Sequence, residues 1–355
     1  MANNDELFDG VAIALGTQAS GFGTVNATVA ALSGALVVGD GIILGDKNSG
    51  DAESGITIPN LSAVVREVAQ IQGTFTAQAD EFVRTVTEGL AITFPLKGNG
   101  ADSGVPTAGN AQPDAGIDEL WGTAGLVGAN GAAAPDYIFT PRATAEYSTV
   151  KLWVADLSWV FQDCLVDVAT IAFTPGGNAL ITANIKVGSI NAFADTITFP
   201  TFTWGTQSSL AAPTVEGVAF GAFGQTRGFE DLTITISNAI EEFGDANVAT
   251  TGIRQSQKDR VITVDGRIYL ETADSDAEYQ ALISTSAPTA DLTMQLGTAE
   301  TGGGSETINA ALISVNNLQA KDIKYDRTGT AAVVELAGAK ATSTTAGTEF
   351  SIEYN

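Results

Sequence analysis

Apolar and polar residues alternate along most of the chain with the two-residue period that is typical of half-buried β-strands. The pattern is clearest in ITISN at 234–238 and in RVITVDGRIYLET at 260–272. Further strands are predicted at 11–15, 35–44, 56–60, 75–96, 149–161, 171–187, 291–297, 308–315, 322–326, 331–338 and 349–355. The pattern therefore predicts a mainly β protein built from antiparallel strands.

Helical spacing of apolar residues occurs in two short stretches. In residues 117–126 three apolar residues fall on one face of a helix. A second helix is predicted over residues 276–285, where Ser275 and Glu278 form a capping box. The neighbouring acidic residues do not form a calcium loop, because Tyr279 stands where that loop needs a glycine.

Two stretches of the first half align with stretches of the second half 178 residues later. ITIPN at 56–60 aligns with ITISN at 234–238. Residues 82–94 align without a gap with residues 260–272. A repeat at an offset of 178 residues indicates two copies of one structural unit, not a solenoid of short repeats.

A third alignment lies nearer the end of each half. Residues 171–182 align with residues 323–334 at an offset of 152, so the first half carries 26 additional residues. The Gly/Ala/Pro-rich loop at 98–116 is their expected position. Pro175-Gly176-Gly177 is predicted to form a hairpin turn, and Arg327-Thr328-Gly329 is predicted to be its counterpart.

Composition divides the chain into four segments. Residues 1–50 are predicted to be an N-terminal arm, and residues 196–228 a Gly-rich connector. Residues 51–195 and 229–355 are predicted to be two units, each an antiparallel β-sandwich or barrel with one short helix. The arm and the loop at 98–116 have little apolar periodicity, so both are expected to become ordered mainly against neighbouring subunits.

Composition also limits the chemistry of the chain. Its formal net charge is −25, and such a surface repels polyphosphates, so tight binding of nucleic acid is not expected. Histidine is absent, which removes the commonest general base and metal ligand. The single cysteine, Cys164, cannot form an intramolecular disulfide and is interpreted as a buried core residue. We therefore predict no catalytic residues, no metal site and no cofactor, and we expect no membrane span or export signal.

One group of basic residues is a candidate for contacts between subunits. It comprises Arg254, Lys258, Arg260 and Arg267. In so acidic a protein, a basic cluster is expected to meet acidic residues on a neighbouring molecule.

The order and rhythm of the strands resemble the tail tube proteins (major tail proteins) of long-tailed bacteriophages, the siphophages. The stretches that carry the resemblance are ITIPN, ITISN, RVITVDGRIYLET, DAEYQALIST, IAFTPGGNALITANI, IKYDRTGTAAVVELAG and the early VAIALGTQASGFGT. Together they cover nearly the whole chain.

The resemblance implies a structural virion protein whose rings stack into a hollow conduit for DNA ejection. Family members with two tandem units form homotrimeric rings with pseudo-sixfold symmetry, so a trimer is expected here, or a hexamer if the duplication is absent. Implied partners are the tape measure protein, the tail terminator and distal tail proteins, and double-stranded DNA in transient passage. The implied location is the virion tail, after assembly in the host cytoplasm.

An acidic channel wall would let DNA pass without adhesion, because like charges repel within a screening length. The candidate lumen-facing acids are Glu241, Glu242, Asp245, Asp322 and Asp326.

Other functions remain open from the sequence. A capsid decoration protein or a surface-layer lattice subunit would also be β-rich and self-assembling. A carbohydrate-binding module would need an exposed aromatic platform, yet the four tryptophans stand mostly among apolar residues. A hydrolase is opposed by the absence of histidine and of an isolated pair of carboxylates.

Overall fold

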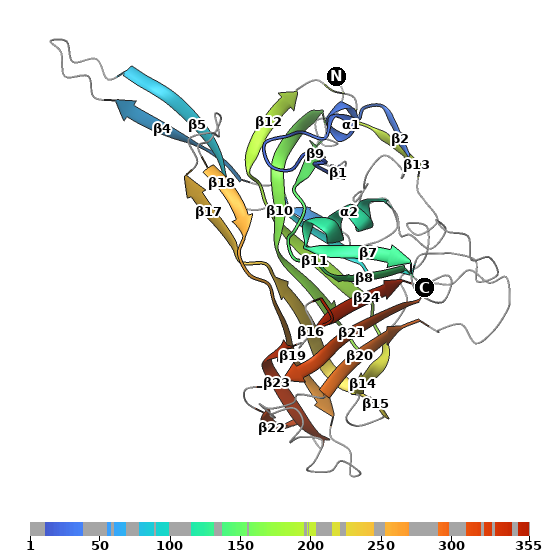
Figure 1. Cartoon of the computed structure of the whole chain (residues 1–355). Coiled ribbons are helices and arrows are strands. Elements are labelled where there is room, and N and C mark those ends of the chain that lie inside the picture. The colour runs from blue at the N-terminus through green and yellow to red at the C-terminus, as the bar shows by residue number, and fades with distance from the viewer. Residues whose placement is uncertain are drawn as a thin grey trace.

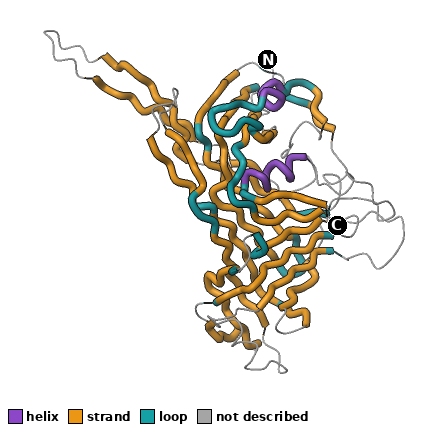
Figure 2. Tube along the Cα trace, in the orientation of Figure 1, coloured by secondary structure: helices purple, strands orange, loops and turns teal. Residues whose placement is uncertain are grey.

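The computed structural model of the chain describes residues 11–37, 55–57, 60–68, 78–88, 90–98, 115–130, 137–154, 156–194, 197, 199–203, 215–220, 225–244, 253–269, 290–297, 310–320, 323–328, 331–342 and 347–354. Strands make up most of these residues (Figure 2). The helices among them are α1 (Ala27–Ala31) and α2 (Ala115–Thr123). The predicted mainly β, antiparallel fold is confirmed, and α2 confirms the helix predicted at 117–126.

Eight strands drawn from both halves form one antiparallel sheet, which we call the eight-stranded sheet. Its order is β3 (Gly55–Thr57), β6 (Leu90–Pro95), β11 (Ala179–Lys186), β10 (Leu157–Phe173), β16 (Phe229–Ser237), β19 (Val261–Tyr269), β23 (Ala331–Ala341) and β22 (Ile323–Thr328). Only the C-terminal half of the long β10 takes part in it. The two halves of the chain therefore meet at the β10–β16 pair.

A second layer packs against one face of this sheet (Figure 1). One part of the layer is β1 (Val11–Thr17), β9 (Ser148–Val154), the N-terminal half of β10, and β12 (Ser189–Ala194). The other part is β15 (Gln225–Arg227), β14 (Val215–Phe220), β20 (Ala290–Leu296), β21 (Ala311–Gln319), β24 (Phe350–Tyr354), β8 (Tyr137–Pro141) and β7 (Leu126–Asn130). Because β10 belongs to both layers and β21 also pairs with β23, eighteen of the described strands wrap around the core as a barrel.

Two hairpins continue beyond the barrel as two-stranded ribbons. The first ribbon is β4 (Asn60–Val68) with β5 (Gln78–Glu88), and it extends the β3–β6 hairpin. The second ribbon is β17 (Ile240–Gly244) with β18 (Ile253–Gln257), and it extends the β16–β19 hairpin. Figure 1 shows both ribbons on the same side of the molecule. A separate parallel pair joins β2 (Ala35–Val37) to β13 (Thr201–Thr203).

The core between the layers draws its residues from both halves. Trp121 of α2, Phe139 of β8 and Tyr354 of β24 are all fully buried. The indole Nε1–H of Trp121 donates to the hydroxyl of Tyr354 over 2.9 Å, and the rings of Phe139 and Tyr354 meet edge to face at 5.7 Å. Buried aromatic groups contribute the largest apolar areas to a core, so this cluster ties the last described strand to the first half.

The order of strands is the same in the two halves. In the eight-stranded sheet, β3-β6-β11-β10 of the first half corresponds to β16-β19-β23-β22 of the second half. In the second layer, β1-β9-β10-β12 corresponds to β14-β20-β21-β24. Both hairpins that lead into a ribbon occupy the same place in their set of four strands.

The strand register departs from the middle alignment, and it follows the third alignment only in part. The third holds for β10 and β22 but is three residues out for β11 and β23, because Ile171 pairs with Ile181, whereas Ile323 pairs with Leu336 and not with the aligned Val333. Ile56 pairs with Ile92, whereas its counterpart Ile234 pairs with Val264. The gapless alignment would place Leu270 opposite Ile234, six residues too far. The middle alignment was wrong because the ribbon and its turn are six residues shorter in the second half.

The extra residues of the first half lie between β6 and β9. This interval contains α2, β7 and β8, whereas only residues 270–289 separate β19 from β20. The predicted helix at 276–285 falls in that shorter interval, outside the described residues, as does most of the loop at 98–116.

Three boundaries differ from those expected. Residues 11–17, assigned to an arm that needs a neighbour, already pair with β9 along their whole length as β1. Residues 215–220, assigned to the connector, form β14 and pair with β20. Residues 240–244 and 253–257, for which no strand was expected, form the β17–β18 ribbon. For β1 and β14, hydrogen bonding to a distant strand, which the local sequence does not reveal, decides the structure.

Candidate functional site

The two ends of the eight-stranded sheet are candidate assembly sites. Among the described strands, β3 pairs only with β6, and β22 pairs only with β23. A strand with one neighbour presents a row of backbone N–H and C=O groups that another strand can pair with. Inside the chain, the equivalent strands β16 and β10 do pair with each other, over six residue pairs from Val168–Ser237 to Phe173–Leu232.

Asn238 fixes the junction between the halves, where β16 leaves the barrel and becomes β17. Its buried side chain donates from Nδ2 to the carbonyls of Ala124 and Val166, both over 2.8 Å. Its Oδ1 accepts from Nε2 of Gln257 over 3.0 Å. Ala239, the next residue, has a φ of +43°, which is unusual for a side chain with a Cβ. The hydrogen bonds of this amide therefore stabilise the strained bend and join three segments of the chain to it.

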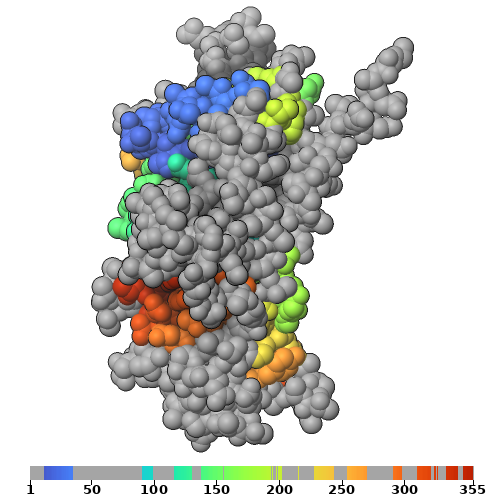
Figure 3. All heavy atoms as spheres, turned by 90° about the vertical axis from the view of Figure 1, so that its right-hand side faces the viewer, coloured from blue at the N-terminus to red at the C-terminus, as the bar shows by residue number. Residues whose placement is uncertain are grey.

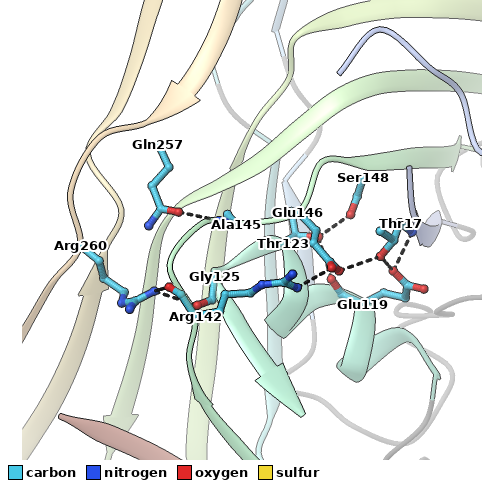
Figure 4. Close-up of polar contacts among 10 residues, drawn as sticks. All are labelled: Thr17, Glu119, Thr123, Gly125, Arg142, Ala145, Glu146, Ser148, Gln257 and Arg260. Atoms are coloured by element: carbon cyan, nitrogen blue, oxygen red, sulfur yellow. Dashed lines mark hydrogen bonds and ion pairs between the residues drawn. The ribbon is translucent and has the colours of Figure 1, made fainter. Parts of the chain in front are cut away.

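Gln257 and Arg260 extend this junction to the loop before β9 (Figure 4). Gln257 accepts the backbone N–H of Ala145 at Oε1 over 2.6 Å. Arg260 donates from one terminal nitrogen to the carbonyls of Gly125 and Arg142, each over 2.8 Å. Gly125 ends α2 with a φ of +82°, so its carbonyl is turned toward the second half.

A pair of carboxylates lies on the other side of this loop (Figure 4). Both the backbone N–H and the hydroxyl of Thr17 donate to Glu119 on α2, and the same hydroxyl is 3.5 Å from a carboxylate oxygen of Glu146. Arg142 forms an ion pair with Glu146. Burial raises the pKa of Glu119, and the hydrogen bonds from Thr17 partly oppose that effect. The pair holds the end of β1 against α2.

The four predicted basic residues do not form one cluster. Arg260 and Arg267 are seven positions apart along an extended strand, a distance of about 23 Å. Arg267 forms ion pairs with Glu230 and Asp326 over 2.9 and 2.7 Å. Each of the four has a partner inside the chain, and contact with a neighbouring subunit stays a prediction.

The other two basic residues lie near the second ribbon. The guanidinium of Arg254 stands 5.0 Å from the ring centre of Phe22, a cation–π contact. Lys258, on the loop after β18, forms an exposed ion pair with Glu241 over 2.6 Å, and this contact raises the pKa of Lys258.

The candidate lumen acids are spread over different elements. Glu241 and Glu242 are consecutive residues on β17, so they point to opposite faces of the ribbon and not along the eight-stranded sheet. Asp326 is exposed on β22 and is paired with Arg267. Asp245 and Asp322 lie outside the described residues.

Lys151 and Asn26 are structural residues that the sequence reasoning did not assign. The buried Nζ of Lys151 donates to the carbonyls of Ala30 and Leu32 at the end of α1, over 2.8 and 2.6 Å. Asn26 is the N-cap of α1, because its Oδ1 accepts from the N–H groups of Thr28 and Val29. The Asn-x-Thr spacing could have indicated that cap, whereas nothing near Lys151 in the sequence indicates its partners.

The described residues contain no group of three or more acidic or cysteine side chains that could hold a metal ion. Cys164 is fully buried, and burial raises the pKa of its thiol. An open depression of about 510 Å³ is lined by residues such as Tyr269, Phe229 and Pro175. None of the helices in the described part of the chain is both long and apolar enough to cross a membrane.

Comparison with known proteins adds no identity. No model of a protein family matches the chain, and no curated protein sequence matches it significantly.

Proposed function

We propose that the protein is a non-enzymatic subunit of a phage tail tube, in which two copies of one unit within each chain form a third of a ring. Support comes from the repeated strand order, from the single neighbours of β3 and β22 among the described strands, and from the internal β10–β16 pair. In this proposal the β10–β16 pair is the template for pairing between chains. The proposed partners are further copies of the chain, the tape measure, terminator and distal tail proteins, and passing duplex DNA in the virion tail.

The internal pair carries the proposal because it supplies a pattern by which one unit would meet the next. The last strand of the first set of four, β10, pairs with the first strand of the second set, β16. By the same rule, β22 of one copy would pair with β3 of the next copy. Repeating this step closes a ring and removes both edges, which solves the problem that open edges pose for a soluble sheet.

A ring of three copies would have a suitable size. Three eight-stranded sheets give a barrel of about 24 strands, and strands about 4.8 Å apart then give a backbone diameter of about 37 Å before tilt widens it. Barrels of about 16–18 strands already enclose an aqueous channel. A three-chain ring would therefore leave a wide lumen after side chains are added.

The template also specifies a register between copies. Inside the chain, Ala172 of β10 lies opposite Thr233 of β16. The sequence offsets of 152 and 178 convert this pair into Lys324 of one copy and Gly55 of the next. Lys324 is exposed, so a substitution there should not disturb the core.

Disulfide cross-linking of a Gly55→Cys, Lys324→Cys variant tests the pairing. Directly opposed residues of an antiparallel pair have Cα atoms about 4.5–5.5 Å apart, which a disulfide can span. We expect oxidised rings to give a ladder of one, two and three chains that ends at three. Gly55→Cys with Asp326→Cys is the matched control. Its two cysteines would be diagonal neighbours about 7–8 Å apart, so it should cross-link poorly.

Electron microscopy of the same samples separates the outcomes. Rings or stacked tubes with a three-chain ladder would support the proposal. A ladder that continues to six chains would contradict the trimer, and flat lattices would favour a surface-layer or decoration protein. Equal cross-linking of the control pair would contradict the register.

A further inference from the structure

One face of the eight-stranded sheet carries a row of threonines in register across five strands. The row is Thr93, Thr182, Thr170, Thr235 and Thr263. All five are partly exposed, whereas their neighbours along each strand, such as Ile92, Ile171 and Ile234, are buried in the core. The hydroxyls of Thr93 and Thr182 lie 3.1 Å apart. The row therefore lies on the face that points away from the core.

The rows on either side of the threonines are almost free of charge. One row is Ala91, Asn184, Val168, Ser237 and Val261, and the other is Pro95, Leu180, Ala172, Thr233 and Asp265. Asp265 is the one ionisable residue in the two rows, and its carboxylate accepts the backbone N–H of Gly338 over 2.7 Å. In a chain with a net charge of −25, three adjacent rows that hold a single ionisable residue are a distinct surface.

Most charged residues near this surface occur in opposite-sign pairs, and Asp265 and Lys340, which lies opposite Thr263 on β23, add one charge of each sign. Toward one end of the strands, Lys186 lies 3.6 Å from Asp167. Toward the other end, Arg267 contacts Asp326 over 2.7 Å, and Lys324 and Glu335 lie 3.7 Å apart on adjacent strands. These pairs keep the potential along the face low, because neighbouring charges of opposite sign largely cancel at a distance.

We propose that this threonine-lined face is the wall that duplex DNA touches as it moves through the tube, and that the wall is neutral and hydroxyl-bearing. The inference rests on the proposed function, in which the face turned away from the core lines the channel. It replaces the expectation of an acidic wall with a different way of avoiding adhesion.

A protein contact with a DNA phosphate has an ionic part and a hydrogen-bonding part, and the two differ in how strongly they hold the DNA. A cationic wall would release condensed counterions from DNA and hold it, with an affinity that falls steeply with salt. A threonine hydroxyl can donate to a phosphate oxygen but carries no charge, so it can exchange that contact for water at little net cost. Such a wall permits close approach without lasting attachment, and its behaviour depends little on ionic strength.

Lysines placed in the row test which surface meets the DNA. The test variant is Thr182→Lys with Thr235→Lys, because Thr170 separates these positions and the new charges are not adjacent. Thr182→Ser with Thr235→Ser is the uncharged control. Thr28→Lys with Ala31→Lys adds the same charge on the exposed residues of α1. Tubes of each protein are assembled with short duplex DNA at low salt, separated from free DNA, and treated with nuclease.

We expect wild-type and serine tubes to retain no DNA. The lysine-row tubes should retain nuclease-protected DNA that salt releases, with log affinity falling by about 0.9 per phosphate contacted for each tenfold rise in salt. The α1 variant should hold only nuclease-sensitive DNA. If the double lysine variant does not assemble, Thr235→Lys alone takes its place.

Three results would overturn the inference. These are lysine-row tubes that retain no DNA, lysine-row tubes whose DNA is as nuclease-sensitive as that of the α1 variant, and wild-type tubes that hold DNA in a salt-dependent way. A wild-type protein that forms no tubes would instead overturn the proposed function, and this inference with it.

Discussion

Asn238 holds the bend between β16 and β17 because both ends of its amide have partners inside the protein. The two carbonyls that it binds belong to Ala124 and Val166, which are 114 and 72 residues away in sequence. A buried carbonyl left without a donor costs about 1–3 kcal/mol. Single polar side chains of this kind thus decide where a strand leaves the barrel, although their own sequence context is unremarkable.

Glu119 gives a prediction at this scale for the dependence of stability on pH. Its pKa in the folded state is raised, so its stabilising contribution is present below pH 4.5 and is lost as the pH rises through the folded pKa. Glu119→Gln removes the charge but keeps an acceptor for Thr17. We expect this variant to be more stable than the wild type at pH 7 and to unfold at a higher denaturant concentration. The gain in the free energy of unfolding should be less than about 1 kcal/mol, because the site is partly solvated.

Denaturant titrations of both proteins between pH 5 and pH 8 check this expectation. The advantage of Glu119→Gln should shrink as the pH falls, because the wild-type carboxyl then takes up a proton. A variant that is less stable than the wild type at pH 7 would show that the ionised carboxylate is the favoured form. Glu146→Gln is a comparison variant at the second carboxylate of the pair, which also forms an ion pair with Arg142.

Residues that point into the core could be read from the sequence, but residues that join distant segments could not. Alternation correctly placed Ile234 and Ile236 on one face, and both are fully buried. Arg260 was assigned to a contact with another subunit, yet it donates to carbonyls of the first half. Its partners lie more than a hundred residues away, and the local alternation of apolar and polar residues carries no information about contacts at such a distance.

Strands were the most predictable elements, and the segments between them were the least. The hairpin at Pro175-Gly176-Gly177 joins β10 to β11 as expected, because glycine supplies the φ of +67° that Gly176 adopts. The helix α1 was not predicted, since five residues give no amphipathic period. What stabilises α1 is its Asn26 cap and, at the other end, the ammonium of Lys151 from a neighbouring strand.

Lys151→Met is expected to loosen α1 without unfolding the barrel. Methionine keeps an apolar side chain of similar length on β9 but leaves the carbonyls of Ala30 and Leu32 without their donor. Hydrogen exchange followed by mass spectrometry should show faster exchange in residues 26–32 and unchanged protection in β10 and β16. Loss of protection throughout the barrel would mean that Lys151 supports the core and not this element alone.

The whole molecule is less divided than its repeated strand order suggests. One core cluster includes residues from both halves, and β24 of the second half pairs with β8 of the first. Boundaries at 195 and 229 follow the repeat, but strands that pair with each other and side chains that share the core lie on both sides of them. Composition could indicate two units, whereas the way in which they share a core depends on pairings far apart in sequence.

We therefore expect one cooperative unfolding transition for the full chain. Separated halves would each expose an apolar face and the edges of the β10–β16 and β8–β24 pairs, so neither should fold alone. Calorimetry should give equal calorimetric and van't Hoff enthalpies for the intact chain. Residues 1–228 and 229–355 produced separately should lack cooperative melting, and mixing them should restore it. Two separate transitions in the intact chain would show that the halves are independent domains.

The β8–β24 pair also has a consequence for protein synthesis. Ile138 pairs with Glu353, so β8 is made more than two hundred residues before the strand that completes it. At translation rates of about 5–20 residues per second, the edge of β8 stays unpaired on the ribosome for about 10–40 s. During that time the nascent chain presents a strand edge beside an incomplete aromatic core, the condition in which chaperones bind and neighbouring nascent chains aggregate.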